Sequence, residues 1–145
     1  DPGNYQDLID PILKGDVNFI LGSRHLEMGT HKFRKFEKEK IFAKVLNLGQ
    51  LLFTTLFNIL YQVKLTDPAT MFKVFRRSCI EDIDFKANYF DLDWEIVAKL
   101  IRKGFVPTEI PVDYQSRSAA EGKKIKFFRD GTTVLLAILR FRFFN

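Results

Sequence analysis

Cationic side chains that could hold a phosphate group stand close together near the end of the sequence. Arg117, Lys123 and Lys124 lie in a stretch rich in Ser, Ala and Gly between a predicted strand and a predicted helix, which is typical of a flexible loop. Arginine binds phosphate oxygens through two parallel hydrogen bonds, and lysine adds a mobile point charge. The loop could therefore close over a pyrophosphate and neutralise a leaving group. A solvated basic loop without a ligand is the alternative.

Three carboxylates stand at the start of another predicted helix. Asp91 and Glu95 are four residues apart and would share one helical face, whereas Asp93 would point elsewhere. A carboxylate in such a position could serve as the general base that a hydroxyl acceptor requires. The alternative is structural: Asp91 or Asp93 caps the helix, and Glu95 complements the helix dipole.

The elements that must position these groups alternate between helix and strand, so the sequence predicts an α/β protein. Gly15 and Gly104 are expected to end the helices before them, Pro68 to end the longest helix, and Asp130 to cap the last one. The apolar pattern predicts helices over residues 5–14, 41–64, 77–83, 92–103 and from 130 onward, and strands over 17–21, 71–75 and 106–114.

The longest helix is apolar enough to raise the question of a membrane span. No charged residue occurs between Val45 and Val63, and 24 helical residues would extend about 36 Å, more than a bilayer core of about 30 Å. Its polar residues nevertheless fall within an arc of about 140°: Lys44, Asn47, Gln50, Thr54, Thr55, Asn58 and Gln62. The pattern therefore predicts an amphipathic helix that lies on a core or on a membrane surface.

The net charge of +5 is concentrated in one part of the chain. Residues 1–113 hold 16 basic and 16 acidic side chains, whereas residues 114–145 hold 7 basic and 2 acidic ones. The composition excludes a disordered chain, a collagen and a disulfide scaffold. A single cysteine, Cys79, is expected to be a small buried side chain, and it favours a reducing, cytoplasmic compartment. The chain starts at Asp1 without Met and reads as a piece of a longer protein.

Four segments of the chain are informative through their order. They are Gly22-Ser23-Arg24, then Thr66-Asp67-Pro68-Ala69-Thr70-Met71-Phe72-Lys73-Val74-Phe75-Arg76-Arg77, then Asp91-Leu92-Asp93-Trp94-Glu95-Ile96, then residues 114–125, which read Tyr-Gln-Ser-Arg-Ser-Ala-Ala-Glu-Gly-Lys-Lys-Ile. In this order they resemble the C-terminal half of a family 2 glycosyltransferase with the GT-A fold. The resemblance covers nearly the whole chain and is greatest to the polyprenyl-phosphate, or dolichyl-phosphate, sugar transferases. It implies an inverting hexosyltransferase that needs Mg²⁺ or Mn²⁺ and a nucleotide-sugar donor.

The resemblance also implies a role for individual residues. Asp93 and Glu95 would be the acceptor-side catalytic carboxylates, and Trp94 would pack against the sugar or the acceptor. The phosphates of the donor would be bound by Arg117, Ser118, Lys123 and Lys124. The acceptor pocket would be lined by Thr66, Asp67, Trp94 and Arg24, although Asp67 could equally be a turn residue before Pro68.

The metal-binding Asp-x-Asp motif and the nucleotide-binding half would lie upstream of Asp1, so no metal ligand is expected within the chain. Residues 1–126 would form the acceptor-side half of the catalytic domain, which alone would be inactive. Residues 127–145 would form a basic, Phe-rich amphipathic helix that anchors the protein peripherally to a membrane, and its phenylalanines are Phe127, Phe128, Phe141, Phe143 and Phe144. The acceptor could be a lipid phosphate, a saccharide or another lipid. The main alternative is a non-catalytic membrane scaffold of the same fold. A nucleic-acid-binding module is the least favoured alternative, and nucleic acid is not the expected partner.

Overall fold

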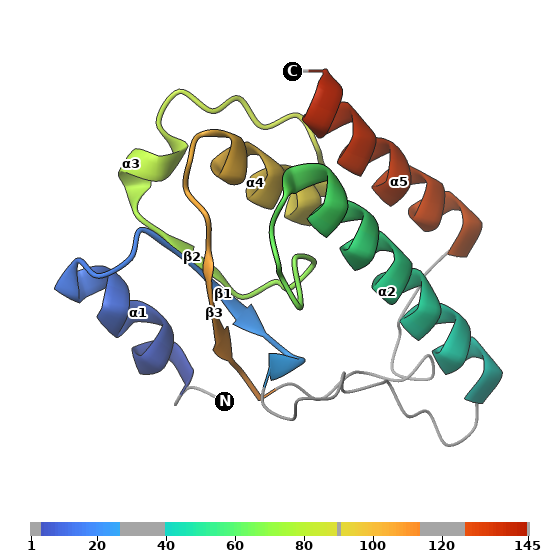
Figure 1. Ribbon diagram of the computed structural model, residues 1–145, viewed down its shortest axis with the longest axis horizontal. Helices are drawn as coiled ribbons and strands as arrows, with labels where there is room; N and C mark the ends of the chain where they lie inside the picture. Colours follow the sequence, from blue (N-terminus) through green and yellow to red (C-terminus); the bar gives the residue numbers. More distant parts are fainter. Residues whose placement is uncertain (1–3, 27–39, 90, 114–126, 145) are drawn as a thin grey trace.

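The protein is a mixed α/β structure in which five helices surround a small sheet (Figure 1). The computed structural model describes residues 4–26, 40–89, 91–113 and 127–144. Within these ranges the elements are α1 (Asn4–Lys14), β1 (Phe19–Ser23), α2 (Lys40–Tyr61), β2 (Lys73–Phe75), α3 (Arg77–Ile80), α4 (Asp91–Arg102), β3 (Thr108–Pro111) and α5 (Phe127–Phe143).

The three strands form one sheet in the order β2-β1-β3. The central strand β1 pairs with β2 in antiparallel and with β3 in parallel orientation. All five residues of β1 are buried, because both faces of the strand are covered, which confirms the buried strand predicted from its apolar run. β3 lies at an edge of the sheet. This position is expected for a strand with Pro107 and Pro111 at its ends, because proline has no N–H group to donate to a neighbouring strand.

Successive side chains of β1 point to opposite faces of the sheet and so belong to two cores. Ile20 packs with Leu8 and Ile12 of α1 in the smaller core. Phe19 and Leu21 face the larger core, to which α2, α4 and α5 contribute. Figure 1 shows α2 and α5 side by side on this second side of the sheet, with α4 beneath them.

Two predicted helix boundaries are corrected by the structure. The longest helix ends at Tyr61 rather than at Lys64, because Gln62 adopts a left-handed φ of 56° and the side-chain amide of Asn58 bonds to both backbone groups of Leu65. Pro68 therefore follows the end of the helix and does not cause it. The last helix begins at Phe127, so Asp130 lies in its first turn rather than at its N-cap.

Two other elements are shorter than predicted: the helix expected over 77–83 ends at Ile80, and the strand expected over 106–114 covers Thr108–Pro111. The remaining boundaries lie within two residues of the predictions. Gly15 and Gly104, which follow α1 and lie just past α4, have φ values of +88° and +92°, a conformation that favours glycine over residues with a Cβ atom. Among the helices that the structure describes, none combines the length and the apolar character needed to cross a bilayer.

Candidate functional site

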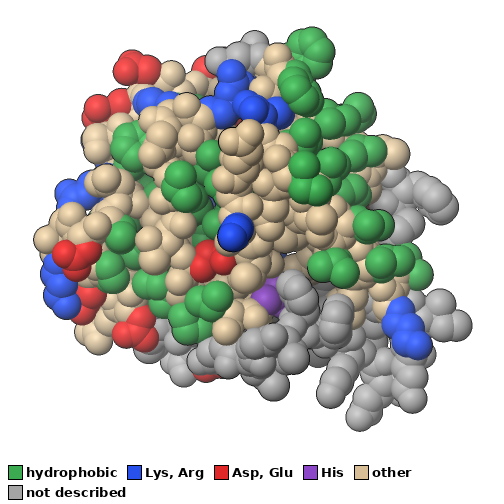
Figure 2. Space-filling model, in the orientation of Figure 1, with side chains coloured by type: hydrophobic (Ala, Val, Ile, Leu, Met, Phe, Trp, Pro, Cys, Tyr) green, Lys and Arg blue, Asp and Glu red, His purple; other side chains and the backbone are tan. Residues whose placement is uncertain are grey.

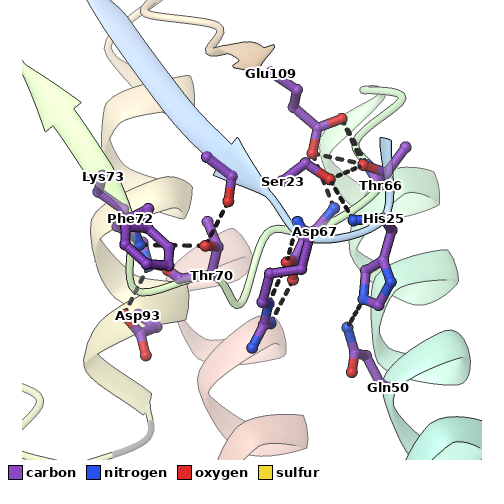
Figure 3. Close-up of polar contacts among 12 residues, drawn as sticks. Ser23, His25, Gln50, Thr66, Asp67, Thr70, Phe72, Lys73, Asp93 and Glu109 are labelled. Carbon is purple, nitrogen blue, oxygen red and sulfur yellow. Dashed lines mark hydrogen bonds and ion pairs between the residues drawn. The ribbon is translucent and has the colours of Figure 1, made fainter. Parts of the chain in front are cut away.

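Polar side chains gather at the edge of the sheet where both parallel strands end (Figure 3). β1 ends at Ser23 and β3 at Pro111, and these two residues are paired in register. In α/β proteins, ligands bind at the carboxyl ends of parallel strands, where loops from several elements meet. The residues that follow β1 here, and the loop of residues 66–72, form the candidate site.

An ion pair between Arg24 and Asp67 occupies the centre of the candidate site. Arg24 donates from Nε to Oδ2 of Asp67 at 2.5 Å and from Nη2 to Oδ1 at 2.7 Å, a bidentate geometry that fixes both side chains. The Asp67 side chain is 0% exposed. A buried charge that lost this partner would be strongly destabilising, so the pair has a structural role. Asp67 also begins a turn, since its carbonyl accepts from the Thr70 N–H at 3.2 Å.

Glu109 holds the segment that carries Asp67. This carboxylate, from β3, accepts hydrogen bonds from the backbone N–H of Thr66 at 2.8 Å and of Asp67 at 2.9 Å, and from the Thr66 hydroxyl at 3.0 Å. The Thr66 hydroxyl also lies 2.6 Å from that of Ser23. Burial raises the pKa of Glu109 although the hydrogen bonds oppose the shift.

The sequence reasoning missed Glu109. A signal was present, since this acidic residue lies inside the mostly apolar segment predicted as the last strand. Which residue it would meet could not be read from that signal, because Glu109 and Thr66 are 43 residues apart in the chain.

The loop 66–72 can approach β1 closely because position 22 is glycine. The N–H of Gly22 donates to the Phe72 carbonyl at 2.8 Å, and its own carbonyl accepts from the Thr70 hydroxyl at 2.6 Å. A Cβ atom at position 22 would lie 2.7 Å from Phe72 and from Val112, which is closer than packed carbon atoms allow.

Asp93 joins the site from the first turn of α4. Its carboxylate lies 2.6 Å from the ammonium of Lys73, at the start of β2, and that ammonium also donates to the Thr70 carbonyl. Burial lowers the pKa of Lys73, and the nearby Asp93 partly offsets this effect. The two side chains differ in exposure, 5% for Lys73 and 37% for Asp93, so the carboxylate is the member of the pair that a ligand could reach.

Part of the polar stripe of α2 faces the protein interior, whereas Lys44, Thr55 and Gln62 are exposed. The amide of Gln50 lies 2.6 Å from Nε2 of His25, in the segment after β1, and Asn58 binds the backbone of Leu65. The hydroxyl of Thr54, between them on the helix, is buried. α2 therefore lines one wall of the candidate site.

Trp94 and Glu95 do not point into the site. The indole of Trp94 is 3% exposed and packs in the larger core with the rings of Phe53 and Phe57, at 6.5 and 5.5 Å. It therefore offers no face to a sugar or an acceptor in this structure, and its predicted role in acceptor binding stays a prediction.

Glu95 has a structural environment of its own. Its carboxylate accepts from the backbone N–H of Lys86 at 3.0 Å and of Ala87 at 2.8 Å, and it pairs with Lys99 at 2.6 Å. Burial alone would raise the pKa of Glu95, but the hydrogen bonds from Lys99, Ala87 and Lys86 together lower it. These contacts hold the segment before α4, a structural role that differs from the dipole complementation expected as the alternative.

Of the predicted site residues, the structure thus brings together Arg24, Thr66, Asp67 and Asp93, and adds Ser23, Thr70, Lys73 and Glu109. The predicted phosphate ligands Arg117, Ser118, Lys123 and Lys124 lie outside the described residues, in the segment that follows β3. In the described part of the chain, no group of three or more His, Cys, Asp or Glu side chains could hold a metal ion.

Chemically, the site presents one accessible carboxylate on a frame of buried ion pairs. Asp93 can accept a hydrogen bond or a proton from a hydroxyl, while its ion pair with Lys73 holds the carboxylate in place. Comparison with models of protein families, with curated proteins and with solved structures gave no match to this chain.

Proposed function

We propose that the chain is the acceptor-side part of a GT-A glycosyltransferase, which moves a sugar from a nucleotide-diphosphate donor to a polyprenyl-phosphate, saccharide or lipid acceptor with inversion. The observation that carries the proposal is the accessible Asp93 carboxylate at the carboxyl ends of two parallel strands, held by Lys73 and beside the Arg24–Asp67 pair. The order of the four sequence segments supports the same reaction class.

In the proposed reaction, an acceptor oxygen attacks the anomeric carbon as the bond from that carbon to the donor phosphate breaks. If the acceptor is a hydroxyl, Asp93 takes its proton as a general base. If the acceptor is a lipid phosphate, its oxygen is already largely ionised near neutral pH and needs no general base. Arg117, Lys123 and Lys124 would neutralise the departing nucleoside diphosphate.

A divalent cation is part of the proposal only for the whole enzyme. The described residues do not form a site for Mg²⁺ or Mn²⁺, and no step above passes through a metal held by them. The metal and the nucleotide would be bound by a donor half upstream of this chain.

Transfer of labelled sugar tests the proposal in the full-length protein. A panel of nucleotide sugars would be supplied with either a polyprenyl phosphate or a saccharide acceptor. We expect Arg117→Ala to lower turnover by at least about a hundredfold with either acceptor, and Asp93→Asn to do so with the saccharide acceptor, whose hydroxyl needs a base. Asp10→Asn, the same change as at position 93 but on the exposed side of α1, should leave turnover unchanged.

Three outcomes separate the alternatives. Activity that is lost in both site variants supports the transferase. Absence of activity with every donor, in a protein that is folded, favours the non-catalytic scaffold. Normal turnover in both variants contradicts the assignment of the site.

The outer face of α2 and α5 supports the proposed peripheral attachment to a membrane. Figure 2 shows apolar side chains gathered over these two helices. We define the α2–α5 face by its exposed apolar residues: Val45, Leu48, Leu51, Leu52, Ile59, Leu135, Leu136, Phe143 and Phe144. Water-facing apolar side chains on two adjacent helices, with Arg140 and Arg142 beside them, are typical of a surface that docks on an anionic bilayer.

One of the phenylalanines predicted to face the membrane does not belong to this face. Phe141 is buried, because it points from α5 into the larger core and packs near the ammonium of Lys99, 5.4 Å from the centre of its ring. Phe143 and Phe144 are exposed as predicted, and the side chains of Phe127 and Phe128 lie outside the described residues.

Vesicle flotation tests the membrane proposal. We expect Leu48→Gln combined with Leu136→Gln to reduce binding to phosphatidylcholine/phosphatidylglycerol vesicles, and higher salt to weaken the binding of the unchanged protein. Leu13→Gln is the control, because Leu13 is more exposed than either of these residues but lies on α1. Equal losses in the double variant and in the control would contradict docking through the α2–α5 face.

A further inference from the structure

A cavity lies away from the candidate site, between the segment after α3 and the last turn of α4. Its volume is about 340 Å³, within the range of small-molecule sites. Six of the side chains that line it are charged: Lys86, Lys99, Arg102, Lys103, Asp82 and Asp84. None of them takes part in the candidate transferase site.

Three of the four cations in the cavity have no carboxylate partner among the residues that the structure describes. Lys99 is neutralised by the buried Glu95 behind it. Arg102 donates to the carbonyl of Phe141 at 2.9 Å and Lys103 to that of Glu81 at 2.6 Å, contacts that fix a side chain without cancelling its charge. No ion pair between described residues includes Lys86, Arg102 or Lys103.

The walls of the cavity are held in place by the same side chains. Glu95 accepts from the N–H groups of Lys86 and Ala87, and Lys99 donates to the carbonyl of Asp84, so α4 fixes the facing segment at three points. Asp82 has a φ of 65°, a left-handed conformation that costs free energy in a residue with a Cβ atom. The cavity is therefore formed before any ligand binds, which lowers the entropic cost of binding.

We infer that this cavity binds a ligand that carries a phosphate group next to an ammonium group, of which phosphoethanolamine is the simplest example. Lys86, Arg102 and Lys103 supply hydrogen-bond donors and charge for the phosphate oxygens. Asp82 and Asp84 would repel a simple anion but can accept hydrogen bonds from an ammonium group. Three cations against two carboxylates leave one net positive charge, which suits a ligand that is neutral overall or carries one net negative charge.

The position of the cavity allows two sources of this ligand. Arg102 ties it to the C-terminal end of α5, where Phe143 and Phe144 are exposed. In Figure 2, Lys and Arg side chains gather along the upper edge of the molecule beside apolar ones. The ligand could thus be the headgroup of an aminophospholipid or a soluble phosphomonoester, and the shared chemistry is the phosphate with its ammonium group.

Calorimetric titration of the full-length protein tests the inference, with phosphoethanolamine, inorganic phosphate and vesicles of phosphatidylcholine with or without phosphatidylethanolamine as probes. We expect phosphoethanolamine to bind more tightly than inorganic phosphate. Lys86→Gln combined with Lys103→Gln should weaken that binding about 25-fold, roughly fivefold for each cation removed. Lys14→Gln with Lys64→Gln, two exposed lysines elsewhere, is the matched control and should bind normally.

The titrations distinguish a lipid ligand from a soluble one, and both from the case in which the inference is wrong. Binding to phosphatidylethanolamine vesicles that the cavity variant loses assigns the lipid, and binding of the soluble probe alone assigns a soluble ligand. Equal affinity for phosphoethanolamine and inorganic phosphate, or unchanged binding in the cavity variant with an unaltered melting temperature, overturns the inference. Sugar transfer does not depend on these residues and is tested separately.

Discussion

Asp93 and Glu95 are two positions apart on α4, and their environments are opposite. Asp93 reaches the surface beside Lys73, whereas Glu95 is buried and accepts hydrogen bonds from the segment before the helix. Because side chains two apart on a helix do not share a face, one of them serves the candidate site and the other holds the chain in place. The two carboxylates should therefore respond to different measurements.

Replacing Glu95 by Gln should destabilise the fold rather than act on the site. Loss of the buried charge leaves Lys99 without its partner, and we expect the free energy of unfolding to fall by about 3 kcal/mol at neutral pH. The folded state lowers the pKa of Glu95, so its contribution is fully present above the unfolded value of 4.5 and is lost as the pH falls through the folded value.

Urea denaturation between pH 2 and pH 7 would measure this effect. The part of the acid destabilisation that Glu95 causes should disappear in the Gln variant. Glu81→Gln, on the exposed side of the same segment, is the control and should change the free energy of unfolding by less than about 0.5 kcal/mol. An acid transition identical in both variants would contradict this role of Glu95.

Tyr61 links the end of α2 to α5 through a single hydrogen bond. Its hydroxyl donates to the Ile138 carbonyl at 3.1 Å, and its ring stacks on Phe57 with centroids 4.1 Å apart. Tyr61→Phe keeps the stacking and should cost about 1 kcal/mol in the free energy of unfolding.

Tyr61→Phe should also change how the free energy of unfolding depends on pH above pH 9. Burial, opposed by Arg102 and Arg142, raises the pKa of Tyr61 to about 12. The stability it contributes is present below pH 10 and is lost as the pH rises toward 12. Denaturation between pH 9 and pH 12 should show this loss in the unchanged protein and less of it in the Phe variant. An equal loss in both would mean that another group titrates.

Among the elements, α2 has an unusual orientation for a helix that borders water. Part of its polar stripe, Gln50, Thr54 and Asn58, is turned toward the rest of the protein, and part of its apolar side is exposed. The periodicity predicted an amphipathic helix correctly. It could not predict that these three polar residues would face inward, because the pattern of one helix does not tell which neighbour each face meets.

The close contact between β1 and the loop 66–72 should make the stability of the protein sensitive to substitution of Gly22. Gly22→Ala places a methyl group 2.7 Å from Phe72 and Val112, so we expect a loss of about 2 kcal/mol or more and a displaced site loop. Gly49→Ala is the matched control, because no atom lies within 4 Å of the added carbon and the residue is in α2.

Thermal denaturation of both alanine variants would decide the matter. Gly49→Ala should raise the stability by about 0.5–1 kcal/mol, since alanine loses less backbone freedom in a helix. A neutral effect of Gly22→Ala would show that the loop does not pack against β1 as described.

For the whole molecule, α5 belongs to the same core as α2 and α4. Val134, Ala137, Ile138 and Phe141 are part of the larger core, together with Trp94 and Phe57. The predicted boundary after residue 126 therefore separates segments that share one core. A helix in this position stabilises the fold as well as presenting the outer face that we propose for membrane docking.

Deletion of residues 127–145 should consequently abolish cooperative unfolding. The deletion exposes the apolar residues of α2 and α4 that α5 covers, so we expect loss of the near-ultraviolet circular dichroism of Trp94 and binding of a hydrophobic dye. The double variant of Leu48 and Leu136 is the control, since both residues are exposed and should leave the melting temperature unchanged. A cooperative transition in the truncated protein would contradict a shared core.

The sequence by itself determined the type and approximate position of the elements, because apolar periodicity, glycine and proline act over a few neighbouring residues. Residues that sequence resemblance singled out for the site, such as Asp67 and Asp93, do meet at one edge of the sheet. Only the tertiary structure decided their partners. Glu109, Lys73 and Ser23 contact residues 20 to 43 positions away, and such contacts depend on strand order and on the close approach at Gly22. The burial of Glu95 beside the exposure of Asp93 was decided in the same way, since exposure is set by what packs against a helix.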